Sequence, residues 1–176
     1  VIFFISFFVL NANADNKEKI INNLKDTYNL SFQFEQNING KIENGNCTIE
    51  YPKKIYCSYK KKNKILVSNG KSLVIKTTSS YYRYPLEKTP LNLILDKNFL
   101  INKINSSEIS EVQGKYFFFQ INENNNNINI FFSKEDYNLV GWQVEDIYQN
   151  LAVTYIFETS INKVINKKIF VLPKSN

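Results

Sequence analysis

The feature that most constrains the fold is a succession of short segments in which apolar and polar residues alternate. Phe32 and Phe34 face one way, while Gln33 and Glu35 face the other, which is the two-residue period of a half-buried strand. Asn-Gly pairs, which favour hairpin turns, occur at residues 39–40, 44–45 and 69–70. The predicted strands are residues 30–36, 46–51, 55–59, 65–68, 73–76, 81–86, 115–121, 128–132, 139–147, 151–158 and 169–172. Their hairpin spacing predicts a mainly β protein with helices (α+β), built on an antiparallel barrel or strongly curved sheet.

Two helices interrupt the strand pattern. Residues 16–29 place Ile20, Ile21 and Leu24 on one helical face, with Asp15 or Asn16 available as the N-cap. A second helix begins at Thr89-Pro90 and places Leu91, Ile94 and Leu95 together. Spacing alone leaves open whether this helix packs on a filled core or covers an apolar space.

The N-terminal segment suggests export. Residues 1–10 are an apolar run that is too short to span a bilayer comfortably, and Ala12 and Ala14 stand at the positions of an A-x-A cleavage site. We therefore expect residues 1–14 to be the remnant of a secretory signal peptide and residues 15–176 to form a single domain. A buried N-terminal strand is the alternative.

Composition argues against several function classes. The net charge of +6 is carried almost entirely by lysine, with Arg83 the only arginine, so nucleic-acid binding is not predicted. A weaker interpretation assigns the Lys60-Lys61-Lys62 cluster to an anionic membrane surface. The chain has no histidine, only five glycines and no nucleophile or phosphate-binding motif. We expect no enzyme activity, no metal and no cofactor.

The two cysteines, Cys47 and Cys57, lie equally far from Pro52. If the strands around Pro52 form a hairpin, both cysteines share one face and a cross-strand disulfide is geometrically possible. Two buried free thiols are the alternative.

The order of these features resembles the LolA family of periplasmic carriers of outer-membrane lipoproteins. The resemblance covers nearly all of residues 15–176. The matching motifs are Phe34-Glu35-Gln36 (family F-x-Q), Tyr51-Pro52 (R-P), residues 66–71 (L-V-S-D-G-K), Pro85-Leu86 with Thr89-Pro90-Leu91 and residues 93–95 (P-L…T-P…L-L), residues 139–146 (L-x-x-W-x-V-x-D), and Phe170 with Pro173 (F…P).

The resemblance implies an incomplete antiparallel β-barrel covered by a helical lid, with an acyl-chain cavity between them. It implies a monomeric periplasmic carrier that an inner-membrane ABC-type release complex loads with acylated lipoproteins. An outer-membrane acceptor, where present, would receive the cargo. A periplasmic lipid or lipoprotein sensor of similar half-barrel fold, acting on a signalling partner, is the alternative. Tyr51 replaces the arginine thought to tie the family's lid to its barrel, which leaves the gating of the lid open.

From this resemblance and the strand alternation we predict which residues meet the ligand. The candidate cavity wall is Phe32, Phe34, Ile49, Tyr51, Ile55, Phe117, Phe119, Trp142, Val144, Tyr155 and Phe157. The candidate lid is Ile20, Ile21, Leu24, Leu91, Ile94 and Leu95. An error of one residue in the register would turn a whole strand to its other face.

Overall fold

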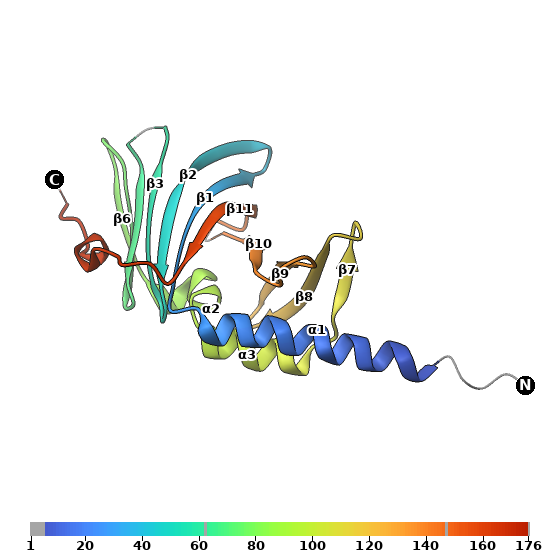
Figure 1. Cartoon of the computed structure of the whole chain (residues 1–176). Coiled ribbons are helices and arrows are strands. Elements are labelled where there is room, and N and C mark those ends of the chain that lie inside the picture. The colour runs from blue at the N-terminus through green and yellow to red at the C-terminus, as the bar shows by residue number, and fades with distance from the viewer. Residues whose placement is uncertain (1–5, 62, 147, 176) are drawn as a thin grey trace, which may run out of the picture.

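A computed structural model describes residues 6–61, 63–146 and 148–175. These residues form an eleven-stranded antiparallel sheet with the order β6-β5-β4-β3-β2-β1-β11-β10-β9-β8-β7. The strands are β1 (Asn29–Ile38), β2 (Lys41–Glu50), β3 (Lys54–Tyr59), β4 (Ile65–Asn69), β5 (Ser72–Lys76), β6 (Tyr81–Pro85), β7 (Ser110–Val112), β8 (Tyr116–Glu123), β9 (Asn126–Ser133), β10 (Leu139–Glu145) and β11 (Leu151–Ile161). The sheet curves strongly but is not closed, since β6 and β7 remain as edges (Figure 1). The predicted fold class is confirmed.

The helices lie on the concave side of this sheet. They are α1 (Ser6–Asp26), α2 (Leu91–Ile94) and α3 (Lys97–Ser106), with 3-10 turns η1 (Leu86–Lys88) and η2 (Lys167–Phe170). Helices α1 and α3 run side by side beneath β7, β8 and β9, and α2 lies nearer the centre of the sheet (Figure 1). Among the described residues, none of the helices combines the length and the apolar character that a membrane crossing requires.

Most predicted hairpins are present, but the predicted turn at residues 44–45 is wrong. Asn39-Gly40 does join β1 to β2, and the turn from β4 to β5 begins at Asn69-Gly70, with Asn69 the last residue of β4. Gly45, in contrast, lies inside β2, where an added Cβ would sit 2.2 Å from the Ser58 carbonyl oxygen and 2.7 Å from the Phe34 ring. This glycine therefore permits a close approach of neighbouring groups within the sheet, and makes no turn.

The helix boundaries differ from those predicted. Helix α1 begins at Ser6 and ends at Asp26, so it runs through the predicted cleavage site at Ala12 to Ala14. Residues 1–5 of the predicted signal peptide lie outside the described residues. Thr89 does not cap α2, because its hydroxyl donates to the Leu86 carbonyl oxygen at 2.8 Å.

Helix α3 was not predicted from the sequence. Asp96 is in fact the N-cap of α3, and its Oδ1 accepts from the Phe99 backbone N–H at 3.1 Å. Leu100 and Ile104 then supply the buried face of this helix.

Two short segments also differ from prediction. Of residues 169–172, predicted as an edge strand, the first two are the end of η2, which begins after its N-cap Asn166, whose side chain accepts from the Lys168 N–H at 3.1 Å. Strand β7, which was not predicted, pairs with β8. Ile147, the last residue of the predicted strand 139–147, lies outside the described residues.

Candidate ligand cavity

The concave face of the sheet holds a cavity of about 590 Å³. Side chains from β1–β6, β10 and β11 and from the start of α2 line it. The volume lies within the range of small-molecule sites in proteins. Its apolar lining is Phe34, Ile38, Ile55, Leu66, Leu73, Ile75, Leu91, Trp142, Val144 and Ala152. Such a surface binds apolar groups without directional contacts.

Alternation along the strands places these residues. In β1, Phe34, Gln36 and Ile38 all line the cavity, while Glu35 and Asn37 between them are exposed. The Phe34 ring meets Tyr59 edge-on, with the ring centroids 5.0 Å apart. Trp142 of β10 meets Phe32 in the same way at 6.2 Å. These aromatic contacts fix the wall beneath the cavity.

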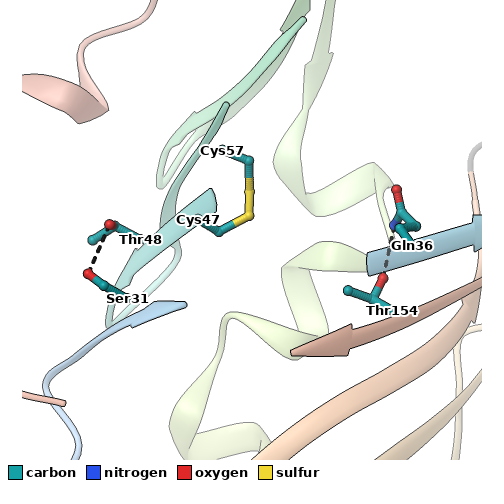
Figure 2. The surroundings of a disulfide bond; sticks show 6 residues. All are labelled: Ser31, Gln36, Cys47, Thr48, Cys57 and Thr154. Atoms are coloured by element: carbon teal, nitrogen blue, oxygen red, sulfur yellow. Dashed lines mark hydrogen bonds between the residues drawn. A yellow bond between two sulfur atoms is a disulfide. The ribbon is translucent and has the colours of Figure 1, made fainter. Parts of the chain in front are cut away.

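A disulfide bond joins two strands in the cavity wall. Cys47 of β2 lies opposite Cys57 of β3, and the two are bonded. Of the two states considered for the cysteines, the structure therefore has the disulfide. Both cysteine side chains line the cavity. Thr48, the residue after Cys47 in β2, forms a hydrogen bond with Ser31 of β1, and the two hydroxyl oxygens are 3.0 Å apart (Figure 2).

Polar groups also reach the cavity. Gln36 Nε2 donates to Thr154 Oγ1 at 2.9 Å between the adjacent strands β1 and β11. Lys64 forms an ion pair with Glu43 and lies over the Tyr59 ring, 4.0 Å from its centroid. Burial, with a smaller contribution from the nearby Glu43 charge, raises the pKa of Tyr59 well above its ordinary value of 10.0.

Two tyrosines bridge the mouth of the cavity. Tyr84 of edge strand β6 and Tyr148 of the β10–β11 turn hydrogen-bond through their hydroxyls at 3.1 Å. This bond raises the pKa of Tyr84 from 10.0 to about 12. Tyr82 of β6 and Tyr148 both line the cavity and are largely exposed. A side-chain contact thus spans the gap between one edge of the sheet and a turn 64 residues away in the chain.

The predicted wall residues fall into three groups, of which the first two point inward. Phe34, Ile55, Trp142 and Val144 line the cavity. Phe32, Ile49, Phe117 and Phe119 are buried in the core. Tyr51, after the end of β2, belongs with this second group, since it packs against the core and burial raises its pKa to about 12.

The third group, Tyr155 and Phe157, faces the opposite side of the sheet, so the predicted orientation of β11 is wrong. Tyr155 is 49% exposed and stacks on Phe157 with 5.7 Å between ring centroids. Ala152, Thr154 and Ile156 point inward instead. The prediction followed the large aromatic residues, whereas the register with β1 and β10 selects the smaller ones.

The predicted lid residues mostly fill the core. Ile20, Leu24, Ile94 and Leu95 are buried in the main cluster, and Ile21 packs against it. Leu91 alone of this set lines the cavity, beside Thr89 and Pro90. The helices therefore fill one part of the concave face and leave the rest open.

Lysines and backbone groups hold the helices to the sheet and to each other. The Lys53 N–H donates to the Leu95 carbonyl oxygen at 2.9 Å, and Lys53 Nζ lies 3.3 Å from Asp96. Lys97 Nζ donates to the carbonyl oxygens of Lys25 and Thr27, both at 2.9 Å. Tyr51 takes part through its backbone N–H, which donates to the Tyr28 carbonyl oxygen at 3.0 Å, and through its ring, whose centroid lies 5.9 Å from Lys97 Nζ.

Several cavity residues were not predicted. Gln36 and Ile38 continue the two-residue alternation of Phe34, so this alternation could have identified them as residues that face the cavity. Leu66, Leu73 and Ile75 lie in strands β4 and β5, which were correctly predicted but not assigned to the wall. Nothing in the local sequence indicates that Tyr84 meets Tyr148, because their contact depends on the curvature of the whole sheet.

Comparison with known proteins places this geometry in a family. The family model described as outer membrane lipoprotein carrier protein LolA matches residues 25–173. No curated protein sequence matches the chain.

Solved structures resemble the fold at low sequence identity. An uncharacterized conserved protein from Thermus thermophilus is 8% identical, covers 92% of this chain and 94% of its own, and has a TM-score of 0.52. An outer membrane lipoprotein-sorting protein domain from Vibrio parahaemolyticus is 7% identical, and the match covers 90% of this chain and 97% of that domain, with a TM-score of 0.49. A LolA superfamily protein from Nitrosomonas europaea is 9% identical over 91% and 97%, with a TM-score of 0.45.

Proposed function

The chain belongs to the LolA family of outer membrane lipoprotein carriers, and from this premise we propose that it binds the acyl chains of lipoproteins in the cavity of its half-barrel. The observation that carries the proposal is the cavity of about 590 Å³ with its predominantly apolar lining. Apolar side chains in an accessible cavity lose contact with water when an apolar ligand enters, which supplies the driving force.

The physical problem that such a carrier solves is the insolubility of its cargo. Each buried methylene of an acyl chain contributes about 0.8 kcal/mol, so a lipoprotein does not leave a membrane freely. A cavity of similar polarity offsets most of this cost, and it accepts many cargoes because apolar contacts are not directional. We place the protein in the periplasm, carrying cargo between the inner and the outer membrane.

The partners follow from this route. We propose that an inner-membrane ABC-type release complex loads the cavity and that an outer-membrane acceptor, where present, empties it. The role is one of binding and transfer, with no chemical step. Entry of cargo would separate Tyr84 from Tyr148 at the mouth and would bring the acyl chain against Leu91 of α2.

A transfer experiment tests the proposal. Residues 15–176 are incubated with membranes that carry a labelled acylated lipoprotein and the ATP-driven release complex, and soluble complexes are separated by size. We expect a soluble one-to-one complex. Recovery of all the label with the membranes would refute the proposal.

Two matched substitutions locate the binding surface. Ile75→Glu introduces a charge into the cavity wall, where burial of an unpaired carboxylate against an acyl chain is costly. Val153→Glu introduces the same charge on β11, at a residue that is 40% exposed on the other face. The first variant should lose the complex and the second should keep it.

A further inference from the structure

Four polar side chains interrupt the apolar wall of the cavity at one level of the sheet. Gln36 of β1 lies opposite Thr154 of β11 on one side and opposite Glu43 of β2 on the other. Lys64 completes the group through its ion pair with Glu43. All four line the cavity. We refer to Gln36, Glu43, Lys64 and Thr154 as the polar band.

Apolar residues flank the polar band on both sides along the strands. Two residues before Gln36 in β1, Phe34 lies opposite Ile156. Two residues after it, Ile38 lies opposite Ala152, whose partner on β10 is Val144. On β1, β10 and β11 the band therefore lies between two apolar levels, whereas on β2 the residue opposite Ile38 is Lys41, which also lines the cavity.

The members of the band differ in how fully they are satisfied. Glu43 and Lys64 neutralise each other, and their side chains are only 15% and 18% exposed. Gln36 donates from Nε2 to Thr154 Oγ1 (Figure 2), which is its sole side-chain hydrogen bond among the described residues. A glutamine amide has two donor hydrogens and an acceptor oxygen, so Gln36 keeps hydrogen-bonding capacity on the cavity side.

A purely apolar ligand would leave this capacity unused. Covering a polar group without a partner costs free energy, so plain hydrocarbon gains less at this level than at the flanking ones. A ligand with a carbonyl or amide group partway along its length would satisfy Gln36 while its chain contacts Phe34 and Trp142. Within the band Glu43 neutralises Lys64, so this pair offers little positive charge to a carboxylate. Lys41, whose Nζ lies 3.7 Å from Glu43, also lines the cavity, but its side chain is 63% exposed and its charge is screened by solvent.

We propose that Gln36, positioned by Thr154, is a subsite for the linkage that joins the acyl chain to the rest of the ligand. The inference rests on the proposed function. It adds that the cavity prefers chains attached through a neutral amide or ester to free fatty acids. The amide would donate its N–H to Gln36 or accept from it, and an ester carbonyl would accept from it.

Displacement of a fluorescent apolar probe, N-phenylnaphthylamine, tests this subsite on the full chain. The competitors are a neutral N-palmitoyl amide and free palmitate. Gln36→Met removes the hydrogen-bonding group while keeping the length of the side chain, and Gln36→Leu repeats the removal with a different shape. Gln33→Leu is the matched control, since Gln33 lies on the other face of β1 and bonds to Glu158.

We expect both Gln36 variants to bind the palmitoyl amide about five- to tenfold more weakly, which is the loss of one hydrogen bond. Their affinities for the probe and for palmitate should not fall, because the substitutions also remove the cost of covering Gln36 with hydrocarbon. Every affinity of Gln33→Leu should stay within about twofold of that of the unaltered chain. Equal weakening of all three ligands, or no weakening of the amide, would overturn the subsite alone. Absence of probe binding by the unaltered chain would instead refute the acyl cavity, and the subsite with it.

Discussion

Two parts of the same sheet use the same alternation of residues with opposite results. The covered wing is formed by β7–β9 with α1 and α3. Its inward side chains in β8 and β9 are at most 2% exposed to solvent. In the open wing, formed by β3–β6, inward residues such as Leu66 and Ile75 are only partly buried and line the cavity. A strand pattern that predicts an apolar face therefore does not predict what fills the space beneath that face. The helices decide this, because they cover one wing and leave the other open.

The largest expected effect comes from truncation in the covered wing. Phe119→Ala should lower the free energy of unfolding by about 3–5 kcal/mol, because Phe119 is fully buried and its removal leaves a void in the core. Ile75→Ala in the open wing should lower it by about 1 kcal/mol, since part of this side chain already faces an open cavity. Urea denaturation of both variants measures the difference.

Ligand binding should show the reverse order. Ile75→Ala removes part of the cavity wall and should weaken binding of an acyl probe, whereas a folded Phe119→Ala should bind it nearly unchanged. Equal stability losses in the two variants would remove the distinction between the two wings.

The sequence predicted the local structure well and its assembly only in part. Asn39-Gly40 and Asn69-Gly70 fixed two turns, and the residues around Pro52 placed Cys47 opposite Cys57. Both results follow from chemistry that acts over a few residues. The LolA resemblance added the prediction of a half-barrel. The family model that matches residues 25–173 confirms the resemblance.

The failures concern contacts between distant segments. Tyr155 was turned inward because a two-residue period does not say which face of β11 is buried. The covering of Phe117 and Phe119 was missed because α3 was not recognised behind its capping residue Asp96. The cavity itself depends on how far α1 and α3 extend over the sheet, which no short segment determines.

The second expected effect concerns the disulfide, which joins β2 to β3 outside the covered wing. The double variant Cys47→Ala/Cys57→Ala should lose about 3 kcal/mol of unfolding free energy, given the sequence separation of 10 residues. The amide hydrogens of β2–β4 should exchange faster in the variant than in the unaltered chain, whereas the exchange rates in β8 and β9 should change less. The unaltered chain in reducing buffer provides the control and should behave as the variant does. Uniform acceleration over all strands would show that the two wings unfold as one unit.

A smaller effect is expected where Lys97 joins the two long helices. Its ammonium group donates to the Lys25 and Thr27 carbonyl oxygens, at the negative end of the α1 dipole. Lys97→Met keeps much of the side chain's apolar stem and should cost about 1–2 kcal/mol of unfolding free energy. Lys71→Met, at an exposed lysine in the β4–β5 turn, is the matched control and should cost almost nothing. If the two variants have the same stability, Lys97 does not hold α3 against the end of α1.

The smallest effect on stability is expected at the mouth of the open wing, where Tyr148→Phe removes the hydroxyl that bridges to Tyr84. The pKa of Tyr84 is raised to about 12 by this bond, so the neutral form is favoured in the folded protein. The contribution of the bond is complete below the unfolded value of 10.0 and is lost as the pH rises toward 12. In the variant the Tyr84 pKa should fall back toward 10.0, which a titration of tyrosinate absorbance measures, with Tyr155→Phe on the other face of β11 as the control.

Because both hydroxyls lie at the surface, the same substitution should leave the urea midpoint almost unchanged. It should nevertheless speed the entry and release of an acyl probe in stopped-flow measurements, since the strand edge and the turn no longer hold each other. Unchanged rates, with a shifted Tyr84 pKa, would mean that the ligand enters elsewhere. The ligand would then reach the open wing by a path that does not pass between Tyr84 and Tyr148.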